Sequence, residues 1–304
     1  MKQEFKIALD WTPNINHIGI FVAQEKSFYL QHNLETIIIN PLTDAYELTP
    51  GKKLELNLAD VAIAPFETVV SLNNKANTVD AIAIFALLQQ DLSCIATLPA
   101  SGITRAKLLD GKLYASYKAR YEDRIVQELV KNDGGTGVIQ ISYPAKLGIW
   151  NTLLEGKADA TWIFDNWEGV EAASKNIALH KFYLRDYGIP YSYSPVLLTR
   201  KSNIEKQITA YTNFAKATRE GYLYAAAHPD EAIAILKPHL TEADQQNIDL
   251  KQAINATAPH FGDAITCGSM QPQRVQAFLQ WLTQHQLEDN SILQQELFTN
   301  KLFA

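Results

Sequence analysis

Short apolar runs with a strand pattern alternate with helical stretches through the first 90 residues, and this order constrains the fold more than any other feature. Strand patterns occupy Phe5–Leu9, Leu34–Ile39, Ala59–Ala64 and Val79–Ala86. Helical spacing of apolar residues runs from Ile18 to Tyr29, over Tyr46–Leu58 and over Glu67–Asn73. The order strand, helix, strand predicts an α/β protein with largely parallel sheets and helices on both faces. At 304 residues the chain is long enough for two lobes.

One sequence motif recurs about a hundred residues later in the chain. The run LLEGKADATWIF repeats the pattern of KKLELNLADVAIAP, in which an amphipathic stretch precedes an Ala-Asp pair and a short strand. The repeat predicts two similar lobes, with one strand ending near Pro65 and its counterpart near Phe164. The β-branched run Leu34–Ile39, ended by Asn40-Pro41, predicts a buried strand.

Charge and composition exclude several classes of function. The formal net charge of -6 argues against a nucleic-acid surface or an anionic membrane surface, which both need clustered Lys and Arg. Cys94 and Cys267 stand alone without a metal-ligand spacing, so we expect no metal site and no disulfide framework. No apolar run is long enough to span a membrane, and no signal peptide precedes the chain as written. It is therefore expected to be cytoplasmic, or periplasmic or extracellular if a leader was removed.

Aromatic, amide and carboxylate side chains gather in the segments that follow the predicted strands. Ligands of open α/β sheets bind beyond the carboxyl ends of strands, where loops on a rigid scaffold carry the contacts. Flat rings beside carboxylates and amides suit a planar polar heterocycle, which needs faces for stacking and edges for hydrogen bonds. The candidate ligand-binding residues are Trp11, Asn16, His17, Glu67, Tyr117, Glu122, Trp167, Glu168 and Tyr191.

Each candidate also has a structural interpretation. Trp11 could be a core or rim residue, and Glu168 could simply open the helix that follows it. Lys118 and Arg120 could be solvated, or they could hold an anion at the start of the predicted helix Tyr121–Lys131. The tyrosines from Tyr187 to Tyr193 could be packing between the lobes. The familiar catalytic and phosphate-binding motifs are absent, since the sequence contains no G-x-S-x-G, Walker, H-E-x-x-H or G-x-G-x-x-G run.

The run ALDWTPNINHIGIFVAQEKSFY, the strand end at Asn40-Pro41, ADVAIAP, the Ser101–Ile103 turn with LLDGK, and EGKADATWIF together carry a family resemblance. From Lys6 to about Leu282 the chain resembles the thiamin pyrimidine precursor family of periplasmic-binding-protein-like proteins. That family contains solute-binding components of ABC transporters and related pyrimidine phosphate synthases. The Trp-x-Pro-Asn-x-x-His phrase is the most specific part of the match.

The resemblance implies a two-lobed, periplasmic-binding-protein-like fold of type II, in which each lobe is a mostly parallel sheet flanked by helices. Residues 1–90 and 196–304 would form lobe 1, residues 91–195 would form lobe 2, and the ligand would lie in a cleft between them, with hinge closure. The ligands of the family are aminopyrimidines such as formylaminopyrimidine or hydroxymethylpyrimidine. By resemblance, Trp11, Asn16 and His17 match the loop after the first strand, and Trp167 and Glu168 lie where a ligand carboxylate is expected.

The departures from the family separate binding from catalysis. The synthase branch carries a Lys and a His after its ADVAIA-like strand and a Cys cluster further on. This chain reads APFETVVSL and SYSPVLLTR at those places, with none of the three. We therefore expect a solute-binding protein for an aminopyrimidine, without a catalytic residue, cofactor or metal, possibly serving an ABC permease. The alternatives are an enzyme of thiamin pyrimidine biosynthesis and a cytoplasmic ligand sensor.

Overall fold

In the computed structural model, which describes residues 3–144 and 149–303, the chain divides into two units. Unit 1 comprises Met1–Asp91, Tyr193–Val275 and Ser291–Ala304, and unit 2 comprises Leu92–Ser192 and Gln276–Asn290. The expected lobes placed everything after residue 196 in lobe 1, and the structure differs in the segment Gln276–Asn290. The reason is aromatic packing, because Phe278 in this segment contacts the rings of Tyr121 and Tyr191 in unit 2.

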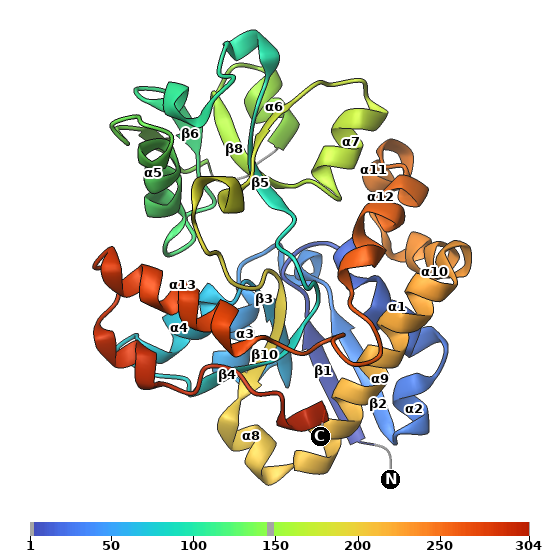
Figure 1. Ribbon diagram of the computed structural model, residues 1–304. Helices are drawn as coiled ribbons and strands as arrows, with labels where there is room; N and C mark the ends of the chain where they lie inside the picture. Colours follow the sequence, from blue (N-terminus) through green and yellow to red (C-terminus); the bar gives the residue numbers. More distant parts are fainter. Residues whose placement is uncertain (1–2, 145–148, 304) are drawn as a thin grey trace. The chain divides into compact units, whose positions relative to one another are not determined.

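The helices and strands of unit 1 come from both ends of the chain (Figure 1). Its strands are β1 (Gln3–Ala8), β2 (Leu34–Ile39), β3 (Val61–Ala64), β4 (Ala81–Ala86) and β10 (Val196–Arg200). Its helices are α1 (Ile18–Glu25), α2 (Phe28–Gln31), α3 (Pro50–Glu55), α4 (Glu67–Asn73), α8 (Lys201–Lys206), α9 (Ile208–Ala227), α10 (Pro229–Leu236), α11 (Glu242–Asn247) and α12 (Leu250–Thr257).

Unit 2 is built from the middle of the chain and most of one late helix. Its strands are β5 (Ser93–Thr97), β6 (Leu113–Ala115), β7 (Gln140–Ser142), β8 (Ala160–Phe164) and β9 (His180–Phe182). Its helices are α5 (Glu122–Asn132), α6 (Ile149–Leu154) and α7 (Glu168–Ser174), and α13 (Pro272–Gln284) begins in unit 1 and continues in unit 2.

The two sheets share one strand order. In unit 1 the order is β2-β1-β3-β10-β4, with β10 antiparallel to both neighbours, and in unit 2 it is β7-β6-β8-β5-β9, with β5 antiparallel to both neighbours. The remaining described pairs, β1 with β2 and β3 and β6 with β7 and β8, are parallel. The predicted α/β class with mostly parallel sheets is therefore confirmed, with one reversed strand in each sheet.

The two Ala-Asp pairs explain the sequence repeat. The Asp60 carboxylate accepts a hydrogen bond from the Lys6 N–H at 2.7 Å, and the Asp60 N–H donates to the Lys6 carbonyl at 2.9 Å. Asp159 makes the same two bonds with Leu113, at 2.9 and 2.8 Å. Each aspartate therefore clamps the start of β3 or β8 to the neighbouring parallel strand, so the repeated phrase encodes the same strand pairing twice.

Three predicted elements differ in the structure. β2 is an edge strand, with Ile37 40% exposed, because its outer side has no described partner strand. The helix predicted over Tyr46–Leu58 begins only at Pro50, since Thr49 caps it by accepting from the Lys52 N–H. The helix predicted from Ile18 to Tyr29 is split at Ser27, whose φ of 62° is left-handed and ends α1.

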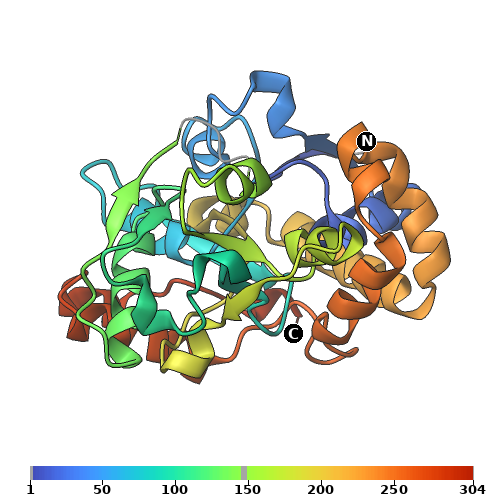
Figure 2. The ribbon, with the colours of Figure 1, turned by 90° about the horizontal axis from the view of Figure 1, so that it is seen from above.

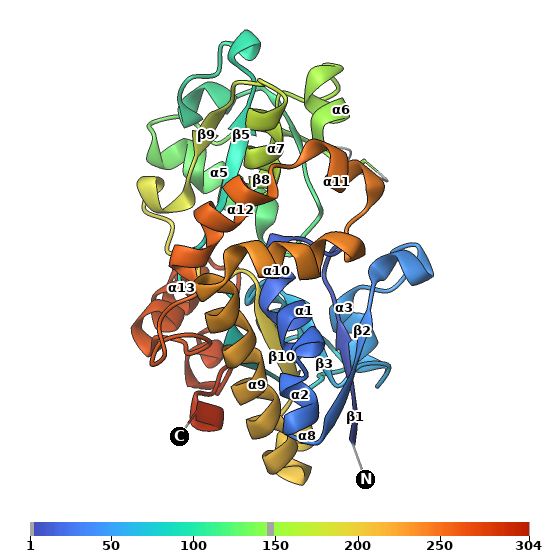
Figure 3. The same cartoon turned by 90° about the vertical axis from the view of Figure 1, so that its right-hand side faces the viewer.

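Packing of α1 on α9 supports the first strand loop of unit 1. The two helices lie side by side in Figures 1 and 3, and they approach closely because both carry a glycine at the contact. A Cβ on Gly19 would lie 2.3 Å from the Tyr222 ring, and a Cβ on Gly221 would lie 2.0 Å from the Gly19 carbonyl oxygen. No other residue type fits either position without a shift of the helices.

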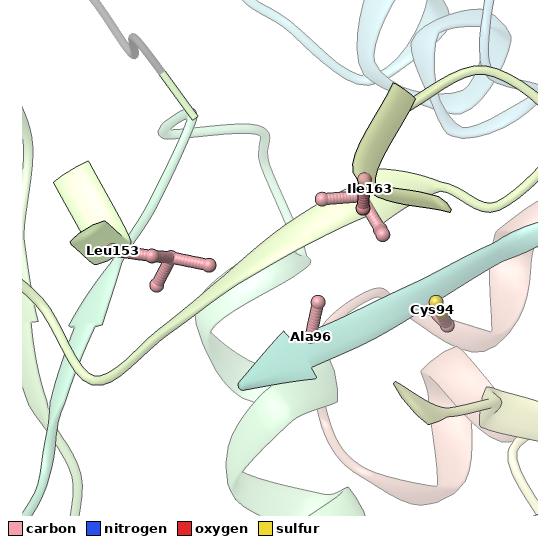
Figure 4. Close-up of a cluster of buried hydrophobic side chains, with 5 residues drawn as sticks. Cys94, Ala96, Leu153 and Ile163 are labelled. Atoms are coloured by element: carbon pink, nitrogen blue, oxygen red, sulfur yellow. The ribbon is translucent and has the colours of Figure 1, made fainter. Parts of the chain in front are cut away.

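One hydrophobic cluster of unit 2 joins two strands of its sheet to the neighbouring helices. Cys94 and Ala96 of β5 point to the same side as Ile163 of β8 and Leu153 of α6, and all four are buried (Figure 4). Ala172 of α7 completes the cluster. Strands β5 and β8 are thus fixed in register, and this register sets where the loop after β8 emerges.

Candidate functional site

The loop after β1 is a closed network of hydrogen bonds rather than a flexible connection. The Asn14 side chain caps a 3₁₀ turn, Ile15–His17, by accepting from the Asn16 N–H at 2.9 Å. The His17 Nδ1 accepts from the Asn14 N–H at 3.3 Å, so the ring proton is on Nε2, which donates to Asp10 Oδ1 at 2.8 Å. His17 is fully buried, and its two ring nitrogens orient the loop.

Asn16 is anchored from the opposite side by α9. Its carbonyl oxygen accepts from the Tyr222 hydroxyl at 2.6 Å, and the Tyr222 ring covers Gly19. Asn16 itself is buried. The predicted pair Asn16 and His17 is therefore brought together as a rigid support for the loop.

Trp11 is the partly exposed ring of this loop. Its ring lies 5.3 Å from that of Tyr46, at an interplanar angle of 52°. Glu67 follows the end of β3, the parallel neighbour of β1, so the loops carrying Trp11 and Glu67 leave the same edge of the sheet. Glu67 is buried in the first turn of α4, where its charge is favoured by the helix dipole.

The corresponding edge of unit 2 lies after the parallel strands β6 and β8. Tyr117 follows β6, and Trp167 and Glu168 follow β8. Tyr117 is 38% exposed, and desolvation followed by the negative charges of Glu168 and Glu122 holds the pKa of its hydroxyl well above the usual range. Tyr117 therefore remains a hydrogen-bond donor at all physiological pH values.

Glu122 is committed to the protein backbone and to a buried tyrosine. One carboxylate oxygen accepts from the Tyr114 hydroxyl at 2.6 Å and from the Tyr117 N–H at 3.0 Å, and the other accepts from the Ala119 N–H at 3.1 Å. Burial raises the pKa of this carboxyl, and these hydrogen bonds oppose the rise. The carboxylate holds the loop after β6 in place and so positions Tyr117.

Trp167 and Glu168 take different places at the start of α7. Trp167 is buried, whereas Glu168 is partly exposed and accepts from the Phe164 N–H at 2.8 Å. Gly169 is required here because a Cβ would lie 2.0 Å from the Asp165 carboxylate. That carboxylate accepts from Lys181 and from the Tyr183 hydroxyl, which ties the loop after β8 to β9 and the segment beyond it.

Tyr191 lies in an aromatic cluster that the sequence pattern only partly predicts. Its ring meets Trp162 of β8 at 5.5 Å and Phe278 of α13 at 5.4 Å, both edge to face. Phe278 in turn stacks on Trp281 at 6.4 Å. Tyr191 is partly exposed, so it retains surface that a planar ligand could use.

The predicted anion site does not assemble around Lys118 and Arg120. Arg120 pairs with Glu288 at 2.5 Å, and the Lys118 ammonium lies over the Tyr143 ring, 5.5 Å from its centroid. The start of α5 already holds two carboxylates, Glu122 and Asp123, which oppose a bound anion. The alternative in which both cations serve the surface of unit 2 fits these contacts better.

Several residues of these edges were not predicted. Tyr46 comes from a segment expected to be helical, Trp162 lies within a strand, and Phe278 comes from a distant helix. Only Trp162 carried a sequence signal, because TWIF is an aromatic member of the repeated phrase. Across residues 3–144 and 149–303, no group of three or more His, Cys, Asp or Glu is placed to hold a metal ion, and no helix there could cross a bilayer.

Comparison with known proteins places these edges in context. A family model described as NMT1/THI5 like matches residues 14–232. A Haemophilus influenzae protein named for thiamine biosynthesis is 25% identical over 232 residues, covering 76% of this chain and 72% of that protein. The formylaminopyrimidine-binding protein of Halalkalibacterium halodurans is 24% identical over 259 residues, covering 82% of this chain and 73% of the relative.

Solved structures with the same fold are more distant in sequence. The periplasmic aliphatic sulphonate binding protein SsuA of Escherichia coli superposes with a TM-score of 0.69 at 13% identity, covering 100% of both chains. This likeness establishes the periplasmic-binding-protein fold, as expected from the sequence.

Proposed function

Because the chain belongs to the NMT1/THI5-like family, we propose that it is a solute-binding protein for a small aminopyrimidine related to the precursors of thiamin. The observation that carries the proposal is the loop after β1. It presents the partly exposed Trp11 from a backbone that Asp10, His17 and Asn14 hold rigid. A preorganised aromatic face of this kind suits a flat heterocycle, and the formylaminopyrimidine-binding relative supports the ligand class.

The candidate residues divide into direct contacts and positioning residues. In the proposal, Trp11 and Tyr191 stack on the ligand, Tyr117 donates to it, and Glu67 and Glu168 accept from its amines. His17, Asn16 and Glu122 act through these residues, because their hydrogen bonds hold the loops that carry Trp11 and Tyr117, and the buried Trp167 directly precedes Glu168.

Calorimetry with formylaminopyrimidine and with hydroxymethylpyrimidine tests the proposal. Stacking on an aromatic side chain is worth about 1–3 kcal/mol, so Trp11→Ala should weaken binding roughly 5- to 150-fold. Trp11→Phe keeps a stacking ring and should retain most of the affinity. A core tryptophan would behave differently, since its loss costs about 3–5 kcal/mol of stability. A large fall in the Tm of Trp11→Ala with unchanged affinity would show that Trp11 is a packing residue.

A pyrimidine phosphate synthase is the second candidate, because the family includes such enzymes. The segment between Asp60 and Leu72 contains no Lys and no His, which the synthases carry after the corresponding strand. We therefore expect no product when the protein is incubated with pyridoxal phosphate and iron. A stoichiometric yield of pyrimidine phosphate in the mass spectrum would replace the binding function by the synthase function.

The partner and the cellular location complete the proposal. A solute-binding protein delivers its ligand to an ABC permease from outside the cytoplasmic membrane, and the periplasmic-binding-protein fold is compatible with this role. Cell fractionation decides between that role and a cytoplasmic sensor. Recovery in the periplasmic or extracellular fraction together with a permease supports transport, whereas recovery only in the cytoplasm supports the sensor.

A further inference from the structure

Residues 40–49 form a connecting segment of unit 1 that has no role in the proposed function so far. We call this segment the strap. It follows β2 and stands out from the rest of unit 1 in Figures 2 and 3, where it is drawn in blue. Its first turn, Pro41–Asp44, is capped by the Asn40 side chain, which accepts from the Leu42 N–H at 3.0 Å.

A buried charge anchors the strap to α3. The ammonium of Lys53, a buried residue, lies 2.8 Å from the Asp44 carboxylate. The Lys53 ammonium is the first cause that lowers the pKa of the Asp44 carboxyl. A buried ammonium is retained only when it is paired, so the strap has one strongly preferred conformation.

This anchor holds two side-chain-bearing residues in a backbone conformation that favours glycine. Ala45 has a φ of 50° and Tyr46 a φ of 63°. For a bulky residue such as tyrosine this conformation is rare, and it persists where the surrounding structure imposes it, often at a functional site. The result is that the Tyr46 ring lies against Trp11, with 39% of the residue exposed.

The surroundings of the Tyr46 hydroxyl are acidic. Desolvation raises the pKa of this hydroxyl, hydrogen bonds from Thr12 lower it, and the carboxylates of Asp10 and Asp244 raise it further. Asp10 directly precedes Trp11, and His17 Nε2 holds its carboxylate at 2.8 Å, so a negative charge stands at the loop that carries the Trp11 ring. Such a field favours an aminated ring, which carries partial positive charge on its exocyclic amine, and opposes a phosphate dianion.

We propose that Tyr46 is a specificity-determining ligand contact, which the strap holds beside Trp11 so that the two rings and the carboxylate of Asp10 select an aminated heterocycle and reject its phosphate ester. The proposal rests on the proposed function and names the subclass of ligand. It also agrees with the contacts of Arg120, the candidate anion ligand of unit 2, which is paired with Glu288.

The first test is calorimetry of hydroxymethylpyrimidine with Tyr46→Asn. Asparagine tolerates the left-handed conformation, so this variant removes the ring and leaves the strap intact. We expect binding to weaken by roughly tenfold, within the range for loss of one stacking ring. Tyr46→Phe keeps the ring and should bind within a few-fold of the unaltered protein. Tyr224→Ala, which removes a tyrosine that stacks on His228 of the same unit, is the matched control and should bind normally.

The second test compares hydroxymethylpyrimidine with its phosphate ester. We expect the ester to bind at least about tenfold more weakly, because the Asp10 carboxylate repels the phosphate dianion. Equal or tighter binding of the ester by the unaltered protein would overturn the selection against phosphate.

The outcomes separate this inference from the proposed function. If the unaltered protein binds neither pyrimidine, the proposed function fails and this inference fails with it. If it binds and Trp11→Ala weakens binding while Tyr46→Asn does not, the function stands and the role of Tyr46 is wrong. Circular dichroism melting of Tyr46→Asn and Tyr46→Phe confirms that the fold is kept in both.

Discussion

Individual side chains at the two sheet edges are distinguished by where their hydrogen bonds go. The sequence alone does not distinguish Glu122 and His17 from Glu168 and Trp11. All four residues stand in polar loops that follow strands. In the structure the Glu122 carboxylate is used by Tyr114, Tyr117 and Ala119 of its own loop. A group engaged in this way positions its neighbours, and its titration is visible in the stability of the fold.

The pH dependence of stability tests the environment of Glu122. Burial raises the pKa of Glu122 above its ordinary value of 4.5, so the native protein keeps this proton to higher pH than the unfolded chain. The contribution of Glu122 to the free energy of unfolding therefore falls as pH rises from about 4.5 through the native pKa. We therefore compare the free energy of unfolding of the unaltered protein with that of Glu122→Gln by urea titration. The unaltered protein should lose stability relative to the variant as the pH rises from about 4.5 to 7.

Asp133 in the same unit provides a control, because its contribution to stability should change with pH in the opposite direction. The Arg105 guanidinium lies 2.6 Å from the Asp133 carboxylate. It is the first cause that lowers the pKa of Asp133 below the ordinary value of 3.8. Its stabilising contribution is present above that value and is lost as pH falls. Against Asp133→Asn, the unaltered protein should lose relative stability on acidification. Parallel slopes for the two pairs would contradict the assigned environment of Glu122.

Among the secondary-structure elements, the contact between α1 and α9 does the most to hold the loop after β1. The Cβ of Gly19→Ala would lie 2.3 Å from the Tyr222 ring, and that ring carries the hydroxyl bonded to the Asn16 carbonyl. Overpacking of this kind costs about 1–3 kcal/mol, so thermal unfolding of Gly19→Ala should show a clear loss of stability. Because the Tyr222 hydroxyl moves with its ring, ligand affinity should fall as well.

Gly51→Ala is the matched control within α3. Its Cβ would lie 3.1 Å from the Thr68 methyl group and at ordinary contact distances of 3.5 and 3.8 Å from the Leu72 methyl groups, and alanine is the better helix former by about 0.5–1 kcal/mol. The change in stability should therefore be within about 1 kcal/mol. Equal Tm values for Gly19→Ala and Gly51→Ala would show that α1 and α9 can separate without cost.

At the scale of the whole molecule, each unit carries one buried thiol, Cys94 in unit 2 and Cys267 in unit 1. Burial raises the pKa of Cys267 to about 12, and Cys94 is fully buried in the core of its unit. At pH 8 the native protein should therefore react with neither thiol on the minute timescale, because the thiolate is the nucleophile. Reaction with a thiol reagent in rising urea, followed by mass spectrometry, then reports the opening of each unit separately.

The same thiol-labelling measurement also tests ligand binding. A ligand stabilises the unit that binds it, so hydroxymethylpyrimidine should slow the labelling of Cys267, the thiol of the unit that carries Trp11. Unchanged labelling of Cys267 at saturating ligand would contradict binding by unit 1. Rapid labelling of either thiol in the absence of denaturant would contradict its burial.

The sequence by itself determined what depends on neighbours along the chain. The strand Leu34–Ile39 and the helix Glu67–Asn73 follow from local apolar periodicity, and the structure has them with the same bounds. The paired Ala-Asp phrases predicted two similar lobes because each aspartate bonds the adjacent strand in the same way. Candidate residues at strand ends were predictable too, because parallel strands place their carboxyl ends on one edge.

Only the tertiary structure decided which partners within the protein engage the polar groups of these residues. Glu122, Arg120 and His17 are engaged by partners within the protein, and no sequence pattern shows how their hydrogen bonds are distributed. Tyr46 lies beside Trp11 in a segment that has a left-handed backbone at Ala45 and Tyr46 and an ion pair from Asp44 to the buried Lys53, and local helical periodicity predicts neither feature. Long-range contacts such as these depend on which segments meet in space. The helical period of 3.6 residues and the strand period of 2 residues give no information about which segments those are.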